Sequence, residues 1–204
     1  MSDRLTKTKS KKPAVVTTNL PIVIVGPPGS GKSTLGNLLS ILYNTEVYSV
    51  GRKWRDQYKK EYPNNDITFE DYWKSIPEAD QLEANKNLKH YAQDLHCIID
   101  TRYPQIFDKD KCLIVYLDAP LGVRVKRVAG RPEYSGKNSE EISTILSERE
   151  RAEAAIGKKL FGTDYRDPNF YHLILDSGLL TPEEEVSAID AKMRELKSLI
   201  RRER

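Results

Sequence analysis

Gly26-Pro27-Pro28-Gly29-Ser30-Gly31-Lys32-Ser33 is the stretch on which the rest of the chain depends, and its pattern is G-x-x-x-x-G-K-S. The β-branched run Pro21-Ile22-Val23-Ile24-Val25 precedes it and predicts a strand buried on both faces. The stripe of an amphipathic helix follows it, with leucines at Leu35, Leu38, Leu39 and Leu42. A strand, a glycine-rich loop and a helix in this order predict a phosphate-binding loop.

Two side chains of this loop have expected chemical roles. Lys32 can reach the β- and γ-phosphates of a nucleotide, and the hydroxyl of Ser33 can bind Mg²⁺. Backbone N–H groups at the helix N-terminus add further contacts, because glycines let the main chain curl around the phosphates. The residues expected to bind the phosphates are Gly26, Gly29, Ser30, Gly31, Lys32, Ser33 and Thr34.

The composition predicts one water-soluble globular domain. The chain has 204 residues, of which 38% are hydrophobic and 31% charged. Its formal net charge of +3 is too small to indicate a nucleic-acid partner, and no apolar run reaches the length of a membrane span. Cys97 and Cys112 each adjoin an apolar strand-like run. They favour two reduced core thiols and a cytosolic compartment.

Basic residues concentrate at the N-terminus, where residues 1–12 contain five lysines and arginines and a single acid. A nucleic-acid-binding arm or a targeting peptide would explain them. Neither an amphipathic pattern nor a cleavable apolar segment accompanies these charges. A solvated, disordered tail over residues 1–19 is therefore favoured.

Apolar runs of strand length recur along the chain and alternate with helical patterns. After the first run, strands are predicted over residues 46–50, 97–100, 113–118 and 172–176. The alternation predicts an α/β fold with a five-stranded parallel sheet and helices on both faces. Ligands of such sheets bind beyond the carboxyl ends of the strands, where the glycine-rich loop and Asp100 fall.

Two long insertions interrupt this alternation, at about residues 51–95 and 132–165. The first contains several helical patterns, one of which is expected to bury Leu88, Tyr91, Ala92 and Leu95. The second has a loop followed by a long helix from residue 138 or 139. Insertions of this size usually cover a ligand rather than merely connect the strands of a sheet.

Arg149 is expected on the apolar face of that long helix. It continues the spacing of four inward residues, Ile142, Ile145, Ala152 and Ile156. A charge on the inward face requires a partner. The spacing leaves two partners open, a phosphate group or a glutamate in an internal ion pair.

The ordered motifs resemble those of nucleoside monophosphate kinases, most of all the short cytidylate kinases. Besides the glycine-rich loop, the motifs are Ser49-x-Gly51-x-x-x-Arg55, Asp100-Thr101-Arg102, Arg127-Val128-Ala129-Gly130-Arg131, and the segment with Arg149 and Arg151 that leads to Phe161-Gly162-Thr163-Asp164. The resemblance runs from about Pro21 to Ile189. It implies a three-layer α/β/α P-loop kinase fold, with residues 20–204 as a single kinase domain. The first insertion would bind the monophosphate and the second would be the lid.

The resemblance also implies roles for individual residues. Those implied to bind the monophosphate are Ser49, Arg55, Asp100, Arg102 and Arg151. Asp100 would hold Mg²⁺ through water, together with Ser33. Arg127 would lie flat on the adenine of ATP as a cation–π platform, and Arg131 would also contact ATP. The implied catalytic residues are Lys32, Arg131 and Arg149.

The implied reaction is the ATP-dependent phosphorylation of CMP or dCMP, in pyrimidine metabolism. The acceptor is a phosphate oxygen that is already anionic near neutral pH, so the reaction requires no strong general base. Positioning and charge neutralisation by Lys32, Mg²⁺ and the arginines would then supply the catalysis. We expect a cytoplasmic monomer whose partners are small nucleotides, and neither membranes nor nucleic acids.

The chain departs from the family pattern at three places. Thr101 stands where cytidylate kinases usually have glycine, which puts its side chain near the acceptor base. Ile156 stands near the usual position of a second lid arginine, which leaves Lys158 or Lys159 to replace it. Arg52 stands where relatives tend to have an acid. These differences concern the choice of base and the turnover rate more than the type of reaction.

Other functions stay open at this point. AMP is the nearest alternative acceptor, although adenylate kinases typically have glycine after the loop lysine and an Asp-Gly-Phe-Pro-Arg motif. A GTPase switch would need Asn-Lys-x-Asp, and Asn85-Lys86-Asn87-Leu88 lacks the acid. A degenerate nucleotide-binding protein would bind ATP without transferring phosphate.

Overall fold

The computed structural model of the protein describes residues 20–64, 66–94 and 97–202, so the predicted tail over residues 1–19 lies outside the described residues. Five parallel strands form one sheet in the order β2-β3-β1-β4-β5. They are β1 (Ile22–Val25), β2 (Val47–Ser49), β3 (Ile98–Asp100), β4 (Leu113–Asp118) and β5 (Leu173–Asp176). The predicted five-stranded parallel sheet is confirmed. Because β1 and β3 are neighbours, the loop after β1 lies beside Asp100.

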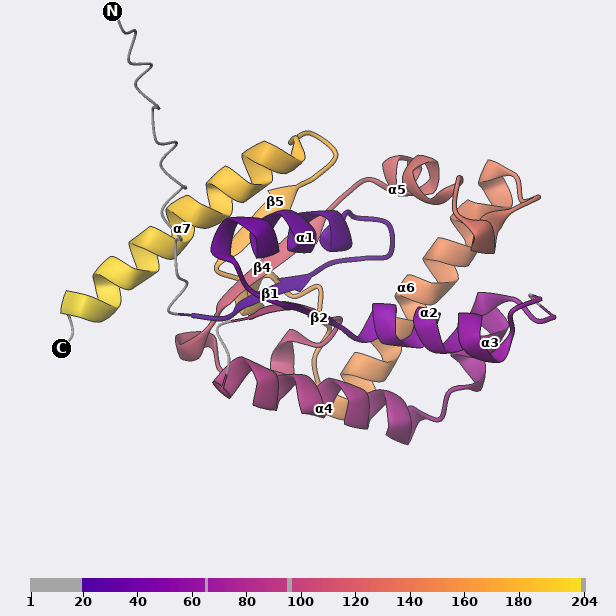
Figure 1. The fold of residues 1–204 in the computed structure, drawn as a ribbon, viewed down its shortest axis with the longest axis horizontal. Helices are drawn as coiled ribbons and strands as arrows, with labels where there is room; N and C mark the ends of the chain where they lie inside the picture. The colour runs from indigo at the N-terminus through magenta and orange to yellow at the C-terminus, as the bar shows by residue number, and fades with distance from the viewer. Residues whose placement is uncertain (1–19, 65, 95–96, 203–204) are drawn as a thin grey trace, which may run out of the picture.

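Helices cover both faces of the sheet, which gives the predicted three-layer α/β/α fold (Figure 1). The covering helices are α1 (Lys32–Tyr43) and α7 (Pro182–Arg202) on one face, and α4 (Glu78–Asp94) and α6 (Ser139–Phe161) on the other. Ile22 and Ile24 of β1 share a core with α1 and α7, whereas Val23 and Val25 share one with α4 and α6. This alternation follows from the two-residue period of a strand, and burial on both faces explains the unbroken apolar run.

The two insertions have small hydrophobic cores of their own, and both lie on the same side of the sheet (Figure 1). In the first, α2 (Val50–Glu61) and α3 (Phe69–Ser75) pack an aromatic cluster against the start of α4. In the second, Tyr134 and the first half of α6 pack against α5 (Leu121–Val128), which precedes the insertion. Four short 3₁₀ turns complete the described part of the chain: Pro104–Ile106, Lys109–Lys111, Pro132–Tyr134 and Pro168–Phe170.

Side-chain caps set the starts of the functional helices. Ser49 ends β2 and caps α2, because its Oγ accepts a hydrogen bond from the backbone N of Arg52 at 3.2 Å. Asn138 begins α6 with a capping box that includes Glu141. Thr181 caps α7, because its Oγ1 accepts from the backbone N of Glu184 at 3.3 Å while its own backbone N donates to the Glu184 carboxylate at 2.8 Å. Strand and insertion are therefore joined without an intervening loop at Ser49.

Two sequence predictions about buried faces are wrong. The spacing predicts Tyr91 in the core, but its side chain is 41% exposed and its ring stacks on Tyr48 with centroids 4.2 Å apart. Leu95, predicted on the same face, lies outside the described residues. On α6 the prediction holds for Ile142, which is buried, but Ile145, Ala152 and Ile156 are only half-buried. The other buried residues of this helix are Leu146, Glu153, Ala154 and Gly157. The buried stripe of α6 rotates along the helix, because its first half packs on α5 and its second half on the sheet.

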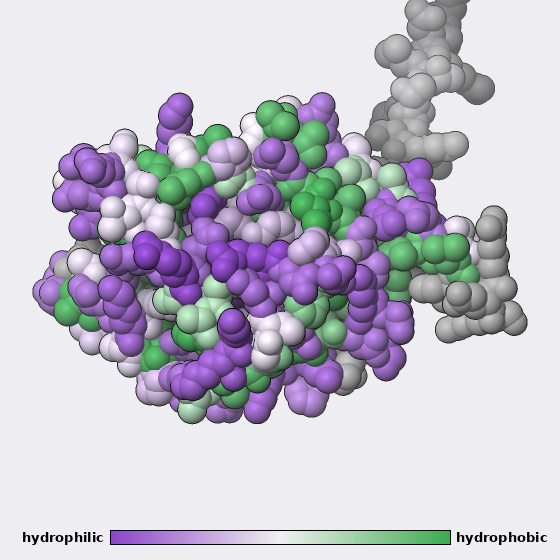
Figure 2. All heavy atoms as spheres, turned by 180° about the vertical axis from the view of Figure 1, so that it is seen from behind, coloured by the Kyte–Doolittle hydropathy of each residue, from purple (hydrophilic) through white to green (hydrophobic). Residues whose placement is uncertain are grey.

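The predicted reduced core thiols are confirmed, since Cys97 and Cys112 are both buried and free. Burial raises the pKa of the Cys97 thiol to about 11 and that of Cys112 to about 12. Both thiols are therefore protonated and unreactive at neutral pH. In the part of the chain that the structure describes, no helix is long and apolar enough to cross a membrane. Figure 2 shows small separate hydrophobic patches among hydrophilic residues on one face.

Candidate active site

The glycine-rich loop connects β1 to α1 in a conformation that other residues cannot adopt without strain. Gly26 has a φ of +149°, and a Cβ there would lie only 2.1 Å from the carbonyl oxygen of Leu117 on β4. Gly31, the N-cap of α1, has a φ of +104°. The loop can therefore approach β4 closely while the first N–H groups of α1 point toward the site, where they suit an anion.

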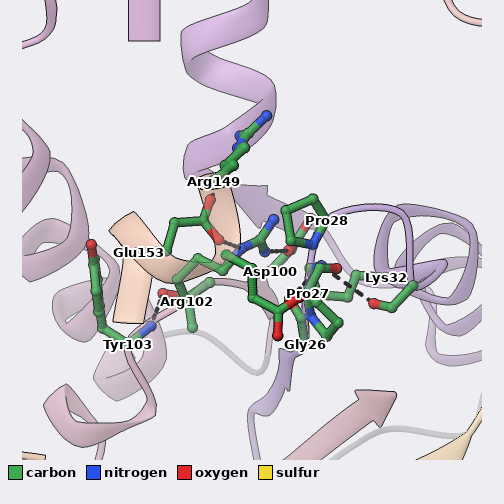
Figure 3. A network of polar contacts seen from close by, with 12 residues as sticks. Gly26, Pro27, Pro28, Lys32, Asp100, Arg102, Tyr103, Arg149 and Glu153 are labelled. Carbon is green, nitrogen blue, oxygen red and sulfur yellow. Dashed lines mark hydrogen bonds and ion pairs between the residues drawn. The ribbon is translucent and has the colours of Figure 1, made fainter. Parts of the chain in front are cut away.

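Lys32 occupies the centre of this loop. Its ammonium Nζ donates to the carbonyl oxygens of Gly26 and Pro27, both at 2.8 Å (Figure 3). The residue is only 6% exposed, and burial, followed by repulsion from Arg102, lowers the pKa of Lys32 well below its usual value. Lys32 is thus a confined donor, held within the loop that is expected to bind the phosphates.

Asp100 ends β3 next to the loop and gathers two hydroxyl groups. Its Oδ2 accepts a hydrogen bond from Ser49 Oγ at 3.0 Å and from Ser33 Oγ at 3.4 Å. The neighbouring positions of β2, β3 and β1 in the sheet cause this meeting. A carboxylate and hydroxyl oxygens are the donors that Mg²⁺ prefers, so the residues present fit this ion. Among the described residues no group of three or more His, Cys, Asp or Glu side chains could hold a metal, so any Mg²⁺ here would need phosphate or water ligands as well.

A cavity in front of the loop collects positive charge. Besides Lys32 and Ser33, it is lined by Arg55, Arg102, Arg131 and Arg149. Arg55 forms no ion pair with a carboxylate among the described residues. Burial, and then repulsion from Arg149, lowers the pKa of Arg55. A buried guanidinium among other cations is stabilised by an anion, so this cavity is suited to phosphate groups. We refer to it below as the transfer cavity.

Glu153 holds two of these arginines in place. Its Oε2 accepts from Arg102 Nε at 2.7 Å, and its Oε1 accepts from Arg149 Nε at 3.1 Å, as Figure 3 shows. Glu153 is 3% exposed, and although burial opposes it, the two guanidinium groups hold the pKa of its carboxyl below the usual value. One carboxylate therefore joins the end of β3 to α6, and leaves the outer N–H groups of both arginines for other partners.

Arg149 also contacts the first insertion. Its NH1 lies 3.6 Å from Glu70 Oε1, and its guanidinium stands 5.4 Å from the ring centroids of both Phe69 and Trp73. Of the two partners that the sequence left open, the structure contains the internal ion pair with glutamates. Arg149 nevertheless lines the transfer cavity, so the ion pairs do not remove it from the site.

A second cavity continues from the transfer cavity toward the first insertion. Its wall combines the aromatic and amide side chains of Trp54, Trp73, Gln81, Asn85 and Tyr103 with charged side chains that it shares with the region around the transfer cavity. The hydroxyl of Thr101 donates to Asn85 Oδ1 at 3.1 Å and accepts from the Tyr103 backbone N at 3.2 Å. Thr101 is 2% exposed, so its side chain is used within the wall of this cavity. We refer to it as the acceptor cavity.

A third cavity, of about 300 Å³, lies on the other side of the loop. It is lined by Gly29, Ser30, Gly31, Thr34, Arg127, Arg131, Pro182 and Glu185. Arg127 is fixed there, because its NH1 donates to the Ser30 carbonyl at 3.1 Å and to Ser177 Oγ at 2.8 Å. We refer to it as the donor cavity, since it adjoins the first turn of α1 and shares Arg131 with the transfer cavity.

The structure brings together most of the residues that the sequence singles out. The transfer cavity is surrounded by Asp100, four arginines and the predicted loop residues except two, and Ser49 adjoins Asp100. Of these two, Ser30 lines the donor cavity, and Gly26 lines neither cavity but accepts from Lys32 Nζ. Arg151 does not join them: it is exposed on α6, and its Nε donates to the Ser147 carbonyl at 3.3 Å. Lys158 is also exposed, and Lys159 pairs with Glu78 of α4 at 2.7 Å, so neither lysine reaches the site.

Sequence reasoning missed several residues that shape the site. Arg124 is buried under the loop, donates to the Pro28 carbonyl at 3.3 Å and pairs with Glu150 at 2.9 Å. Glu153 and Glu70 partner Arg149, but only Glu153 has a signal in the sequence, because it follows Arg149 by four residues on the same helix. The contacts of Arg124 and Glu70 join distant segments, which a spacing pattern cannot show.

Known proteins with similar sequences are kinases. The profile of a family described as the cytidylate kinase-like family matches residues 49–179. The cytidylate kinase of Sulfolobus acidocaldarius is 32% identical over 173 residues, which cover 82% of this chain and 91% of that protein. The cytidylate kinase of Pyrococcus abyssi is 30% identical over 177 residues, which cover 87% of this chain and 95% of that protein.

Solved structures show the same fold at much lower identity. A gluconokinase from Sinorhizobium meliloti 1021 matches with a TM-score of 0.60 and 14% identity, over 93% of this chain and 100% of that chain. Such a distant likeness concerns the fold alone. It agrees with the three-layer arrangement around a glycine-rich loop described above.

Proposed function

The chain belongs to the cytidylate kinase-like family and is a nucleoside monophosphate kinase, and from this premise we propose that it transfers the γ-phosphoryl group of ATP to CMP or dCMP. The observation that carries the proposal is the row of three adjoining cavities. The transfer cavity, lined by Lys32 and four arginines, lies between the acceptor and donor cavities and shares residues with both. Two nucleotides placed end to end would meet there, phosphate to phosphate.

The donor would occupy the loop. Backbone N–H groups at the start of α1 and the ammonium of Lys32 would bind the β- and γ-phosphates of ATP. Arg127 would support the adenine from one side of the donor cavity, where its guanidinium is already fixed by Ser30 and Ser177. Arg131, which is 43% exposed at its side chain, would reach between the donor and the transferring group.

The acceptor would place its phosphate on Arg55 and its base in the acceptor cavity. Arg55 suits this role because its guanidinium is largely buried and free of an acid partner among the described residues. Gln81 and Asn85 carry the amide groups that could pair with the edge of a small pyrimidine base. The cytidylate kinase names of the relatives support cytosine as that base.

The chain's own groups account for the catalysis by position and charge. Lys32, Arg131 and Arg149 would neutralise the charge that spreads over the transferring phosphoryl oxygens. Glu153 would orient Arg149 and Arg102, because its carboxylate pairs with both guanidinium groups and offsets the repulsion between them. Ser33 directly, and Asp100 through water, would hold Mg²⁺, which when bound supplies further charge neutralisation at the phosphates.

We also propose that residues 20–204 form one kinase domain. Within it, about residues 51–95 would be the acceptor-binding insertion and about residues 132–165 a lid over the site. Contacts between the two insertions through Arg149 and Glu70 support a coupled closure that excludes water. The free buried thiols of Cys97 and Cys112 fit a cytoplasmic enzyme. Light scattering tests our proposal that it acts as a monomer.

Steady-state assays across acceptors test the proposed function. The purified chain would be given ATP, Mg²⁺ and one of CMP, dCMP, UMP or AMP, and each diphosphate product would be identified by chromatography. We expect the highest kcat/KM for CMP or dCMP. A preference for AMP would contradict the proposed acceptor, and ATP binding without any diphosphate product would indicate a nucleotide-binding protein without transfer activity.

A further inference from the structure

Glu185 is an acidic side chain in the donor cavity to which the proposed reaction gives no role. It lies in the first turn of α7 and lines this cavity together with Gly31, Thr34 and Arg127. Its side chain is only 4% exposed. Phosphates bound at the loop would occupy the end of the cavity near Gly31, so the α7 end is where the base of a nucleotide would lie.

The carboxyl group of Glu185 lacks a partner within the described chain. Its backbone N donates to the Thr181 carbonyl at 3.0 Å, but no hydrogen bond or ion pair of the described residues ends on its side chain. Arg127 is the cation whose charge acts on the pKa of Glu185, but its hydrogen bonds go to Ser30 and Ser177 instead. Among the described residues, the enclosed side-chain oxygens that lack a hydrogen-bond partner do not include those of Glu185, so its carboxyl oxygens stay accessible from the donor cavity. A ligand in that cavity can therefore supply the hydrogen bond that the protein does not.

Helix capping does not explain Glu185. An acid near a helix N-terminus is favoured by the helix dipole, but exposed acids serve that purpose equally well. Glu183 and Glu184 are both exposed in the same turn, and Glu184 already accepts from the Thr181 backbone N at 2.8 Å. The burial of Glu185 therefore requires another reason.

The protonation of Glu185 is compatible with a ligand contact at neutral pH. Burial raises the pKa of its carboxyl to about 7, and the positive charge of Arg127 limits that rise. Both the ionised and the neutral forms present an oxygen that accepts a hydrogen bond. An N–H group of a base can therefore be bound in either form.

We propose that Glu185 accepts a hydrogen bond from the exocyclic amino group of the donor adenine and is a specificity-determining residue for the donor. This inference rests on the proposed function, which places ATP in the donor cavity. Arg127 would contact the face of the base and Glu185 its edge. A site with a buried acceptor discriminates against a base without the matching N–H, because its own group is then left unpaired.

The proposal is tested by removing the amino group from the base of the donor and, separately, the carboxyl group of Glu185 from the protein. The donors are ATP and purine riboside 5′-triphosphate, which has the same ring system without the amino group. We expect the wild-type chain to prefer ATP by about tenfold or more in kcat/KM, as a hydrogen bond to a carboxylate would give. In Glu185→Leu and in the smaller Glu185→Ala, this ratio should fall to about one. Glu183→Leu is the matched control and should keep the wild-type ratio.

Equilibrium binding separates this inference from the proposed function. Calorimetry would measure the Kd of ADP and of purine riboside 5′-diphosphate for the same variants, with no acceptor present. If the chain makes no CDP, the proposed function fails, yet a loss of ADP preference in Glu185→Ala would still support the contact. The inference is overturned if the wild type shows no preference for the amino group, or if the variants weaken both ligands equally.

Discussion

The cationic side chains of the site differ in the groups that neutralise them, and this difference indicates which of them bind phosphate. Arg102 and Arg149 share the carboxylate of Glu153, which fixes their orientation. Arg55 has no such partner among the described residues, and Lys32 is held by carbonyl oxygens rather than by an acid. Unneutralised cations bind incoming anions most strongly, so we expect Arg55 and Lys32 to carry phosphate binding.

Replacing Arg55 should separate the two substrates. In Arg55→Ala the KM for the monophosphate should rise by about 10- to 100-fold, as expected for the loss of hydrogen bonds to a charged group, while the KM for ATP changes little. Steady-state kinetics with each substrate varied in turn measure both constants. Arg52→Ala is the control, because Arg52 is exposed and donates to Asn37 at 3.1 Å. A larger effect on ATP would show that Arg55 serves the donor instead.

Removing the ammonium of Lys32 should abolish most of the transfer. Lys32→Ala should lower kcat by about 100-fold or more, because a preorganised positive charge at the transferring group is lost. The loop's shape depends on Gly26 and Gly31, so circular dichroism and thermal melting should show a folded variant. Unaltered turnover in this variant would contradict a catalytic role for the loop.

At the scale of elements, α6 contacts several separate parts of the site. Through Glu153 it contacts Arg102, just after β3, and through Arg149 it contacts Glu70 of α3. Through Glu150 it contacts Arg124 of α5. These are ionic contacts within a largely buried region. Their geometry is therefore well defined but depends on every partner being present.

Neutralising Glu153 should disturb both stability and turnover. Glu153→Gln leaves two partly buried guanidinium groups without their shared charge, and should lower the free energy of unfolding by about 3–5 kcal/mol. We also expect kcat to fall, since Arg149 loses its orientation. Urea denaturation and steady-state kinetics measure the two effects. Glu148→Gln, at an exposed position on the same helix, should match the wild type in both.

At the scale of the whole molecule, the sheet contains a titratable side chain between its last two strands. His172 precedes β5, and its Nδ1 accepts a hydrogen bond from the backbone N of Ile114 at 3.0 Å. Burial, and then the charge of Lys109, lowers the pKa of His172 below its usual value. Protonation of Nδ1 would remove this hydrogen bond between β4 and the start of β5.

The fold should consequently lose stability on acidification. Since the pKa of His172 is lower in the folded chain than the value of about 6.5 in the unfolded chain, protons bind preferentially to the unfolded chain as the pH falls through this range. Urea denaturation at pH 7.5 and pH 5.5 should show a smaller pH-dependent loss for His172→Gln than for the wild type. The difference in this loss between the two proteins isolates the contribution of His172. Both proteins contain Glu185, whose raised pKa favours the folded chain on acidification. Equal losses in the two proteins would show that His172 does not contribute.

Local patterns in the sequence were sufficient for the elements and for the loop. Apolar runs such as Ile22–Val25 predicted all five strands, because a buried parallel strand needs side chains that are apolar on both faces. The same reasoning failed where a residue's environment is not local. Tyr91 stacks on Tyr48 at the surface instead of entering the core, and the buried stripe of α6 changes direction between two packing partners.

The amino-acid sequence alone determined the strand–loop–helix unit, the parallel α/β class and the family, since these depend on periodicity and on glycines at set spacings. Only the tertiary structure decided which charges meet. Glu153 joins Arg102 and Arg149, Glu70 reaches Arg149 from the first insertion, and Glu185 faces the donor cavity. Most of these contacts join residues far apart in the chain. Their distances depend on the strand order β2-β3-β1-β4-β5, and no local spacing determines that order.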